Sequence, residues 1–195
     1  GIARLLRRIV QWRVSLLWYV IPIIGYPLAF VAALSLTQGA EPLTALVQKW
    51  PLVLTSYLPA IVFGILYPGL GEEPGWRGFA LPRLQENNSP FRSSLIIGIL
   101  WGAWHLPVLI GRDVLSIVAF SLLSFGLSFL FTLMFNSSGS SLIPVLLFHA
   151  TQNWEDGFEV IFPALVGTDW ELVSTLALLL IGVVAGVLVW RNGRL

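Results

Sequence analysis

The two histidines of this chain, His105 and His149, each lie inside an apolar stretch of sequence. A third polar group, Glu72 and Glu73 followed by Arg77, comes directly after another apolar run. An ionisable side chain inside a bilayer costs about 2.5–3.5 kcal/mol on insertion scales, so such residues tend to face a protein interior or a wet cavity. Three such groups in one small hydrophobic chain indicate a catalytic centre buried in the membrane.

The residues within these groups pair at helical spacing. On a helix, Glu73 and Arg77 are neighbours four residues apart, which leaves Glu72 pointing about 100° further round the axis. A carboxylate that no cation neutralises is available as a general base. His149 and Asn153 are also four residues apart, and two donors on one face are what a developing oxyanion requires.

Each group also has a simpler interpretation. Glu72 and Glu73 could begin a salt-bridged helix near the membrane surface, because acidic residues are favoured in a first helical turn. His105 could be a structural histidine bonded to a neighbouring helix. His149 and Asn153 could supply hydrogen bonds between helices, as such residues do in membranes. These alternatives remain open for each group alone, but their coincidence in one small chain favours a common site.

The composition predicts a membrane protein. Of the 195 residues 56% are hydrophobic and 11% are charged, and the mean hydropathy is +0.83; a soluble domain carries about 25% charged residues. A net charge of +1 leaves no basic face for phosphates, so we expect no nucleic-acid partner. Cysteine is absent, which excludes disulfides and thiolate metal sites. Because the chain starts without methionine, we expect it to be a processed or truncated piece.

We predict an all-α fold, a polytopic transmembrane helical bundle of about six spans with a buried polar active-site cavity. A span needs about 20 apolar residues, and prolines inside the first two stretches should kink them. We see no repeat or linker, so the chain is interpreted as a single transmembrane domain over residues 1–195. The predicted spans are residues 14–36, 51–70, 93–110, 114–135, 142–160 and 172–190, with a separate polar–apolar helix at 71–86.

The arginines orient this bundle, because cytoplasmic loops carry an excess of positive charge. Under a six-span count, the arginines near the N-terminus fall on the same side as Arg83, Arg92, Arg191 and Arg194. We therefore expect an integral protein of the cell (inner or plasma) membrane, in contact with lipid, with both termini in the cytoplasm.

Taken in order, the three groups resemble the signature of the CAAX-processing and bacteriocin-immunity family of intramembrane proteases, also called Abi or Rce1-like. Its motifs are Glu-Glu-x-x-x-Arg, aromatic-x-x-x-His and His-x-x-x-Asn. They match residues 72–77, 101–105 and 149–153, within a core of about residues 55–155. The flanking residues 76–85 are typical of bacterial members. Trp101 stands where the family often has phenylalanine, and we expect this position to supply packing.

The resemblance implies an endopeptidase that cleaves peptide bonds within or near the membrane. It implies that Glu72 is the general base and that His105 helps to hold the attacking water. His149 and Asn153 are implied as oxyanion stabilisers. Glu73 and Arg77 are implied as residues that support the site, although the motifs do not settle which of the two glutamates is the base. The predicted catalytic residues are Glu72, Glu73, Arg77, His105, His149 and Asn153.

Water is the expected nucleophile, because cysteine is absent and no serine lies in a Gly-x-Ser-x-Gly motif. Whether a metal takes part stays open. The family is commonly called metalloprotease, and Glu72, His105 and His149 could bind zinc with one open position. Against zinc, no His-Glu-x-x-His helix is present, and Glu73, the base that would remain, is the predicted partner of Arg77. We favour a metal-free glutamate mechanism.

The expected partners are membrane lipid and a peptide or protein substrate. The substrate could be a prenylated CAAX-like peptide, a peptide pheromone, a bacteriocin leader or a membrane protein. Two other classes remain as alternatives. A transporter subunit would carry polar residues all along a membrane path, whereas here they gather in three groups. A catalytically silent scaffold or a bacteriocin self-immunity protein would tolerate the loss of a motif residue, and every motif residue is present.

Overall fold

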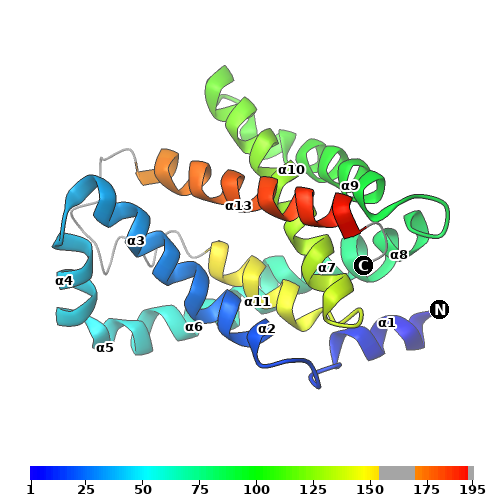
Figure 1. The fold of residues 1–195 in the computed structure, drawn as a ribbon, viewed down its shortest axis with the longest axis horizontal. Helices are drawn as coiled ribbons and strands as arrows, with labels where there is room; N and C mark the ends of the chain where they lie inside the picture. The colour runs from blue at the N-terminus through cyan, green and yellow to red at the C-terminus, as the bar shows by residue number, and fades with distance from the viewer. Residues whose placement is uncertain (154–169, 193–195) are drawn as a thin grey trace.

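The computed structural model describes residues 1–153 and 170–192 (Figure 1). All regular structure within these residues is helical, which confirms the predicted all-α fold. The α-helices are α1 (Ile2–Ile9), α2 (Leu17–Val20), α3 (Tyr26–Gln38), α4 (Glu41–Gln48), α5 (Trp50–Leu52), α6 (Leu58–Gly64), α7 (Leu70–Gly75), α8 (Leu81–Leu84), α9 (Pro90–Trp104), α10 (Val114–Ser137), α11 (Ile143–Gln152) and α13 (Trp170–Asn192).

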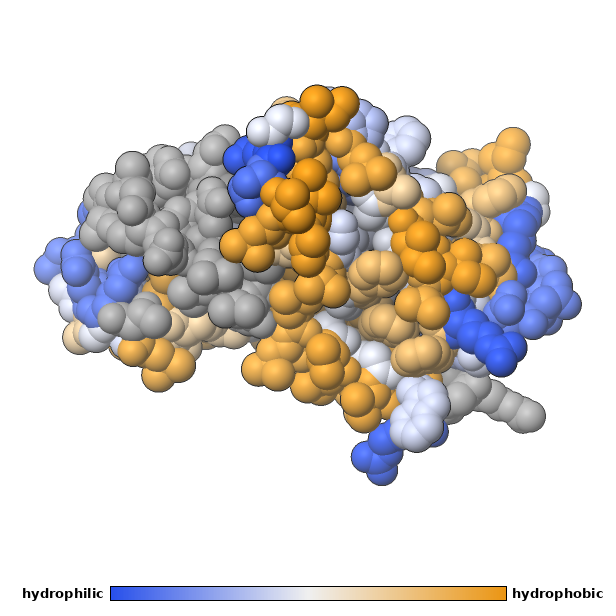
Figure 2. Space-filling view, turned by 90° about the horizontal axis from the view of Figure 1, so that it is seen from above, coloured by the Kyte–Doolittle hydropathy of each residue, from blue (hydrophilic) through white to orange (hydrophobic). Residues whose placement is uncertain are grey.

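Within the described residues, three helical stretches are long and apolar enough to cross a membrane. They are Leu17–Leu36, Trp50–Leu84 and Val114–Ser137, and Leu178–Arg191 is a shorter apolar helix. Many large apolar side chains are exposed. Figure 2 shows them covering much of the centre of one face, with strongly hydrophilic side chains gathered mainly towards its ends. An apolar surface of this extent marks contact with a membrane or a partner, and with helices of this length a membrane is the natural partner.

Residues 50–84 form one helical stretch, so the predicted boundary between the second span and the polar helix is wrong. The stretch continues through three π-helical turns, at Val53–Tyr57, Ile65–Gly69 and Trp76–Ala80. Pro68 lies inside the second of them. Proline has no N–H to bond to the preceding turn and crowds the carbonyl four residues back, and the wider π-turn accommodates it without ending the helix. The two glutamates therefore extend directly from a membrane helix.

The predicted span at residues 93–110 ends earlier than expected. α9 is a helix of 15 residues that ends at Trp104, and Leu106–Leu109 turns as a 3₁₀-helix. The reason is local, since a proline at position 107 disfavours helical geometry in the residue before it. His105 consequently occupies the C-cap of α9, where the chain changes direction.

α10 is the longest unbroken helix of the described chain, and it packs along both α9 and α13 (Figure 1). Asp113 caps its N-terminus by accepting a hydrogen bond of 3.0 Å from the Ser116 N–H. At its crossing with α13, a Cβ added to Gly182 would lie 2.3 Å from the Gly126 Cα. Only glycine allows the two backbones to approach this closely.

α11 carries His149 and is buried on all sides. Its residues from Pro144 to Thr151 are all buried. Phe148 packs in the main core with Trp101 and Phe131, whereas Leu147 and Ala150 pack in a second core against α3 and α6. Figure 1 shows α11 in the middle of the molecule, between these helices and α10. The predicted span at residues 142–160 is described only to its middle, because residues 154–169 lie outside the described part.

Candidate active site

The fold brings five of the six predicted site residues into one cluster. Glu72 and Glu73 come from α7, Arg77 from the π-turn that follows it, His105 from the end of α9 and His149 from α11. The contacts described below link these side chains across segments that are up to 76 residues apart in the chain.

The inner part of the cluster is a buried triad. Arg77 Nη1 donates to both carboxylate oxygens of Glu73, at 3.0 and 3.1 Å, which is the pairing that their spacing predicts. His149 Nδ1 lies 2.7 Å from Glu73 Oε1. Glu73 and Arg77 are fully buried and His149 is nearly so. Buried charges are tolerated in proteins when they are paired and hydrogen-bonded, so Glu73 is committed to its two partners.

Two aromatic rings enclose the guanidinium of Arg77. Its central carbon lies 4.6 Å from the ring centre of Trp101 and 4.7 Å from that of Phe131. Within the described residues, Arg77 Nε and Nη2 have no hydrogen-bond partner. The negative faces of the two rings partly compensate the positive charge by cation–π interaction. This packing holds the arginine, and through it Glu73, in one position.

The outer part of the cluster is the pair of Glu72 and His105. Glu72 Oε1 lies 3.9 Å from His105 Nε2, and each side chain exposes about a fifth of its surface, 19% and 21%. His105 Nδ1 is 2.8 Å from the carbonyl oxygen of Trp101. A carbonyl only accepts, so Nδ1 carries the proton and Nε2 of the neutral ring is an acceptor. Two acceptors at this separation can share the two hydrogens of one water molecule.

Trp101 does more than the packing that the sequence predicted for it. Its indole Nε1–H donates to Glu72 Oε2 at 2.5 Å. Its ring also meets both imidazoles at steep angles, with centroids 5.6 Å from His105 and 5.8 Å from His149. The sequence held a signal for this contact, because tryptophan has a donor that the family's frequent phenylalanine lacks.

Asn153 follows the end of α11 and is the sixth predicted residue. It is the C-cap, its backbone N–H bonds to the His149 oxygen at 3.1 Å, and its side chain is exposed. The contact of His149 with Glu73 is made by Nδ1, and Nε2 is the other ring nitrogen. That nitrogen donates to an oxyanion only when the ring carries protons on both nitrogens, with Glu73 as the charge partner.

The described side chains do not form a metal cage. No group of three or more His, Cys, Asp or Glu side chains in residues 1–153 and 170–192 is placed to hold a metal ion. Of the predicted zinc ligands, Glu72 and His105 face each other, and each histidine has its Nδ1 beside an oxygen, the Glu73 carboxylate for His149 and the Trp101 carbonyl for His105. Histidines that ligate a metal usually make such a contact through their other ring nitrogen, so these contacts by themselves do not exclude a metal.

Fold and site together define a helical integral membrane protein with a buried carboxylate–histidine cluster. The chain belongs to the Rce1-like family, because the model of the type II CAAX prenyl endopeptidase Rce1-like family matches residues 54–154, more than half of the sequence. This match confirms the resemblance that the motifs indicated.

A curated relative matches a shorter segment. The CAAX prenyl protease 2 of Methanococcus maripaludis is 40% identical to this chain over 55 residues. That segment is 28% of this chain and 20% of the relative, so the match spans about a fifth of the relative's length.

Proposed function

We propose that this protein is an intramembrane endopeptidase in which Glu72 activates a water molecule held jointly with His105. One observation carries the proposal. Glu72 and His105 face each other at 3.9 Å with exposed edges, while every other charged group of the cluster is buried and paired. Membership of the Rce1-like family, and the name of the Methanococcus maripaludis relative, support a protease.

The contacts favour Glu72 over Glu73 as the base, a choice that the motifs leave open. Glu73 accepts two hydrogen bonds from Arg77 and contacts His149, and it is fully buried. A general base must come within hydrogen-bond reach of the proton that it abstracts. Only Glu72 combines an accessible oxygen with an acceptor partner for the same water.

Peptide hydrolysis can proceed with these side chains alone. Glu72 takes a proton from the water molecule while the water oxygen bonds to the scissile carbonyl carbon. The electrons of the carbonyl double bond move onto the carbonyl oxygen. His149 Nε2–H and the Asn153 amide donate to that oxyanion. Glu72 then returns its proton to the leaving nitrogen as the carbon–nitrogen bond breaks, which restores the carboxylate. We derive no step through a metal ion.

The substrate is a peptide or protein that reaches the cluster from the bilayer. The outer surface is apolar around the membrane-spanning helices, so a segment that is itself apolar or lipidated would approach it most readily. The relative is named for CAAX prenyl substrates, and a farnesylated CAAX-like peptide is therefore the first substrate to test. We place the protein in the cell membrane with its termini in the cytoplasm.

The test is cleavage of a quenched fluorescent farnesylated peptide by the protein in lipid vesicles. Glu72→Gln and His105→Ala should each lower the rate about 10²–10⁴-fold, the range of general acid–base contributions. Glu86→Gln removes an exposed carboxylate outside the cluster and should leave the rate unchanged. Thermal unfolding of each variant verifies its fold. If a folded Glu72→Gln protein kept more than half of the activity, Glu72 would not be the base.

Metal dependence needs its own measurement. Elemental mass spectrometry of the purified protein, with cleavage measured before and after strong chelation, separates the two mechanisms. Cleavage by a metal-free protein supports the water activation proposed here. About one zinc per chain, with activity lost on chelation and restored by zinc, would contradict it and make Glu72, His105 and His149 the ligands.

A further inference from the structure

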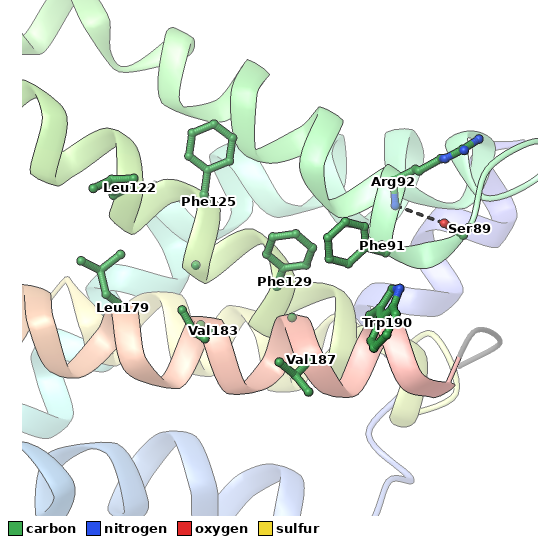
Figure 3. A pocket seen from close by; sticks show the side chains of 13 residues that line it. Ser89, Phe91, Arg92, Leu122, Phe125, Phe129, Leu179, Val183, Val187 and Trp190 are labelled. Carbon is green, nitrogen blue, oxygen red and sulfur yellow. Dashed lines mark hydrogen bonds between the residues drawn. The ribbon is translucent and has the colours of Figure 1, made fainter.

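A cavity of about 600 Å³ lies between α9, α10 and α13 (Figure 3). This volume falls within the range of roughly 300–1,000 Å³ that is typical of ligand pockets. None of the six predicted catalytic residues lines it. It is therefore a second place where a molecule could bind, and we call it the α13 groove. The groove is lined by Ser89, Phe91, Arg92, Leu122, Phe125, Gly126, Phe129, Leu179, Gly182, Val183, Gly186, Val187 and Trp190.

Most of the α13 groove is apolar, and its lining residues extend along α13. Leu122, Phe125 and Leu179 lie at one end, and Val183 and Val187 continue along α13 (Figure 3). Glycines of α10 and α13 also line it, among them Gly126 and Gly182 at the crossing of the two helices. A lining of this kind matches a hydrocarbon chain, which offers no polar group to be satisfied.

The other end of the groove is polar and positively charged. Arg92 is exposed there beside Ser89, with its side chain extending outward, and Trp190 lines the same end (Figure 3). Among the residues that line the groove, none is acidic. The first turn of α9, which carries Arg92, also has no acidic residue, so both the arginine and the helix dipole favour an anion. Tryptophan is typical of the membrane–water interface, where lipid headgroups lie.

We propose that the α13 groove binds an anionic phospholipid, with one acyl chain along α10 and α13 and the phosphate beside Arg92. Charge selects this occupant. A lipid with a net negative headgroup gains the attraction of a basic residue at the membrane surface. A zwitterionic lipid has the same chains without that net attraction. The indole of Trp190 suits the boundary between the headgroup and the acyl chains of the bound anionic lipid.

Native mass spectrometry of the detergent-solubilised protein tests this proposal, with phosphatidylglycerol and phosphatidylcholine of identical chains added in turn. The wild type should bind phosphatidylglycerol at least fivefold more tightly than phosphatidylcholine. Arg92→Gln should reduce this preference to less than twofold. Arg112→Gln, which removes an exposed arginine that does not line the groove, should preserve it. Val183→Trp should fill the groove and weaken the binding of both lipids.

The outcomes are decisive in either direction. Equal binding of the two lipids by the wild type would mean that the groove takes any acyl chain, which overturns the anionic proposal. A preference that survives in Arg92→Gln and falls in Arg112→Gln overturns it as well. A dimer mass that is lost in Val183→Trp would assign the groove to a second copy of the chain instead. Arg92→Gln changes an exposed side chain, so it keeps the test valid if Val183→Trp does not fold.

Discussion

Replacing Trp101 with phenylalanine would remove one hydrogen bond from the site while keeping a ring in place. The indole N–H donates to Glu72 Oε2 at 2.5 Å, and a hydrogen bond to a charged group contributes about 1.5–3 kcal/mol. Phenylalanine still covers the guanidinium of Arg77, which lies 4.6 Å from the tryptophan ring. If Glu72 is the base, the loss of its fixed position should lower kcat/KM roughly 10–100-fold, since about 1.4 kcal/mol corresponds to tenfold.

The assay is vesicle-based cleavage of the farnesylated peptide over a range of substrate concentrations. Because Trp101 touches the base, we expect the loss in kcat with KM nearly unchanged, and unfolding temperatures within a few degrees of the wild type. Trp104→Phe is the matched control, since Trp104 lies on the same helix and is 64% exposed. If Trp101→Phe stayed within about threefold of the wild type in kcat, the indole hydrogen bond would have no part in positioning Glu72.

Three further substitutions test a buried ion pair, a close helix approach and a helix cap. Glu73→Gln leaves the buried charge of Arg77 uncompensated, so the free energy of unfolding should fall by about 3–5 kcal/mol, measured by thermal or denaturant unfolding. Gly64→Ala would place a Cβ 2.9 Å from the backbone of α11, so it should cost about 1–3 kcal/mol and slow cleavage. Side-chain and backbone hydrogen bonds from Ser116 lower the pKa of Asp113. The ionised carboxylate therefore stabilises the fold above its ordinary pKa, and Asp113→Ala should lower the unfolding temperature at pH 7 but progressively less as the pH falls towards 3.

Each of these predictions has a control and a result that would contradict it. Glu86→Gln should leave stability unchanged, and a Glu73→Gln protein as stable as the wild type would mean that the arginine finds another partner. Gly71→Ala is the control for the close helix approach, because nothing lies within 4 Å of its added Cβ. For Asp113→Ala, a deficit that is the same at pH 7 and pH 3 would show that the carboxylate charge is not what stabilises the helix start.

The sequence predicted the helical class, the Glu73–Arg77 pair and the family, because each follows from local spacing or from side-chain chemistry. It did not predict that Glu73 also contacts His149, since the two residues are 76 positions apart and meet only through the packing of α11. The hydrogen bond from Trp101 to Glu72 was missed for the same reason. Spacing within one helix says which side chains are neighbours on it, but not which face of another helix they meet.

The sequence also predicted some helix boundaries incorrectly. The end of the apolar run led us to expect a boundary between residues 70 and 71, yet the chain continues as one helical stretch through its π-turns. Hydropathy also led us to extend the third predicted span beyond His105 to residue 110. The helix α9 instead ends at Trp104, because the proline at position 107 disfavours its continuation. Both differences arise because hydropathy measures how apolar a stretch is and not how its backbone is hydrogen-bonded.

The π-turn at Ile65–Gly69 has a consequence for how this helix tolerates changes in length. A π-turn contains one residue more than the α-turn that it replaces, and one residue of an α-helix corresponds to about 100° of rotation. Deleting a single residue there would let the segment close as an ordinary α-helix. Because the π-turn holds that extra residue within one turn, Glu72 and Glu73 would keep nearly the same direction relative to α6. The same deletion within the regular helix of α6 would instead turn both glutamates by about 100° relative to the part of the helix before it. A one-residue deletion should therefore be tolerated better in this π-turn than in α6.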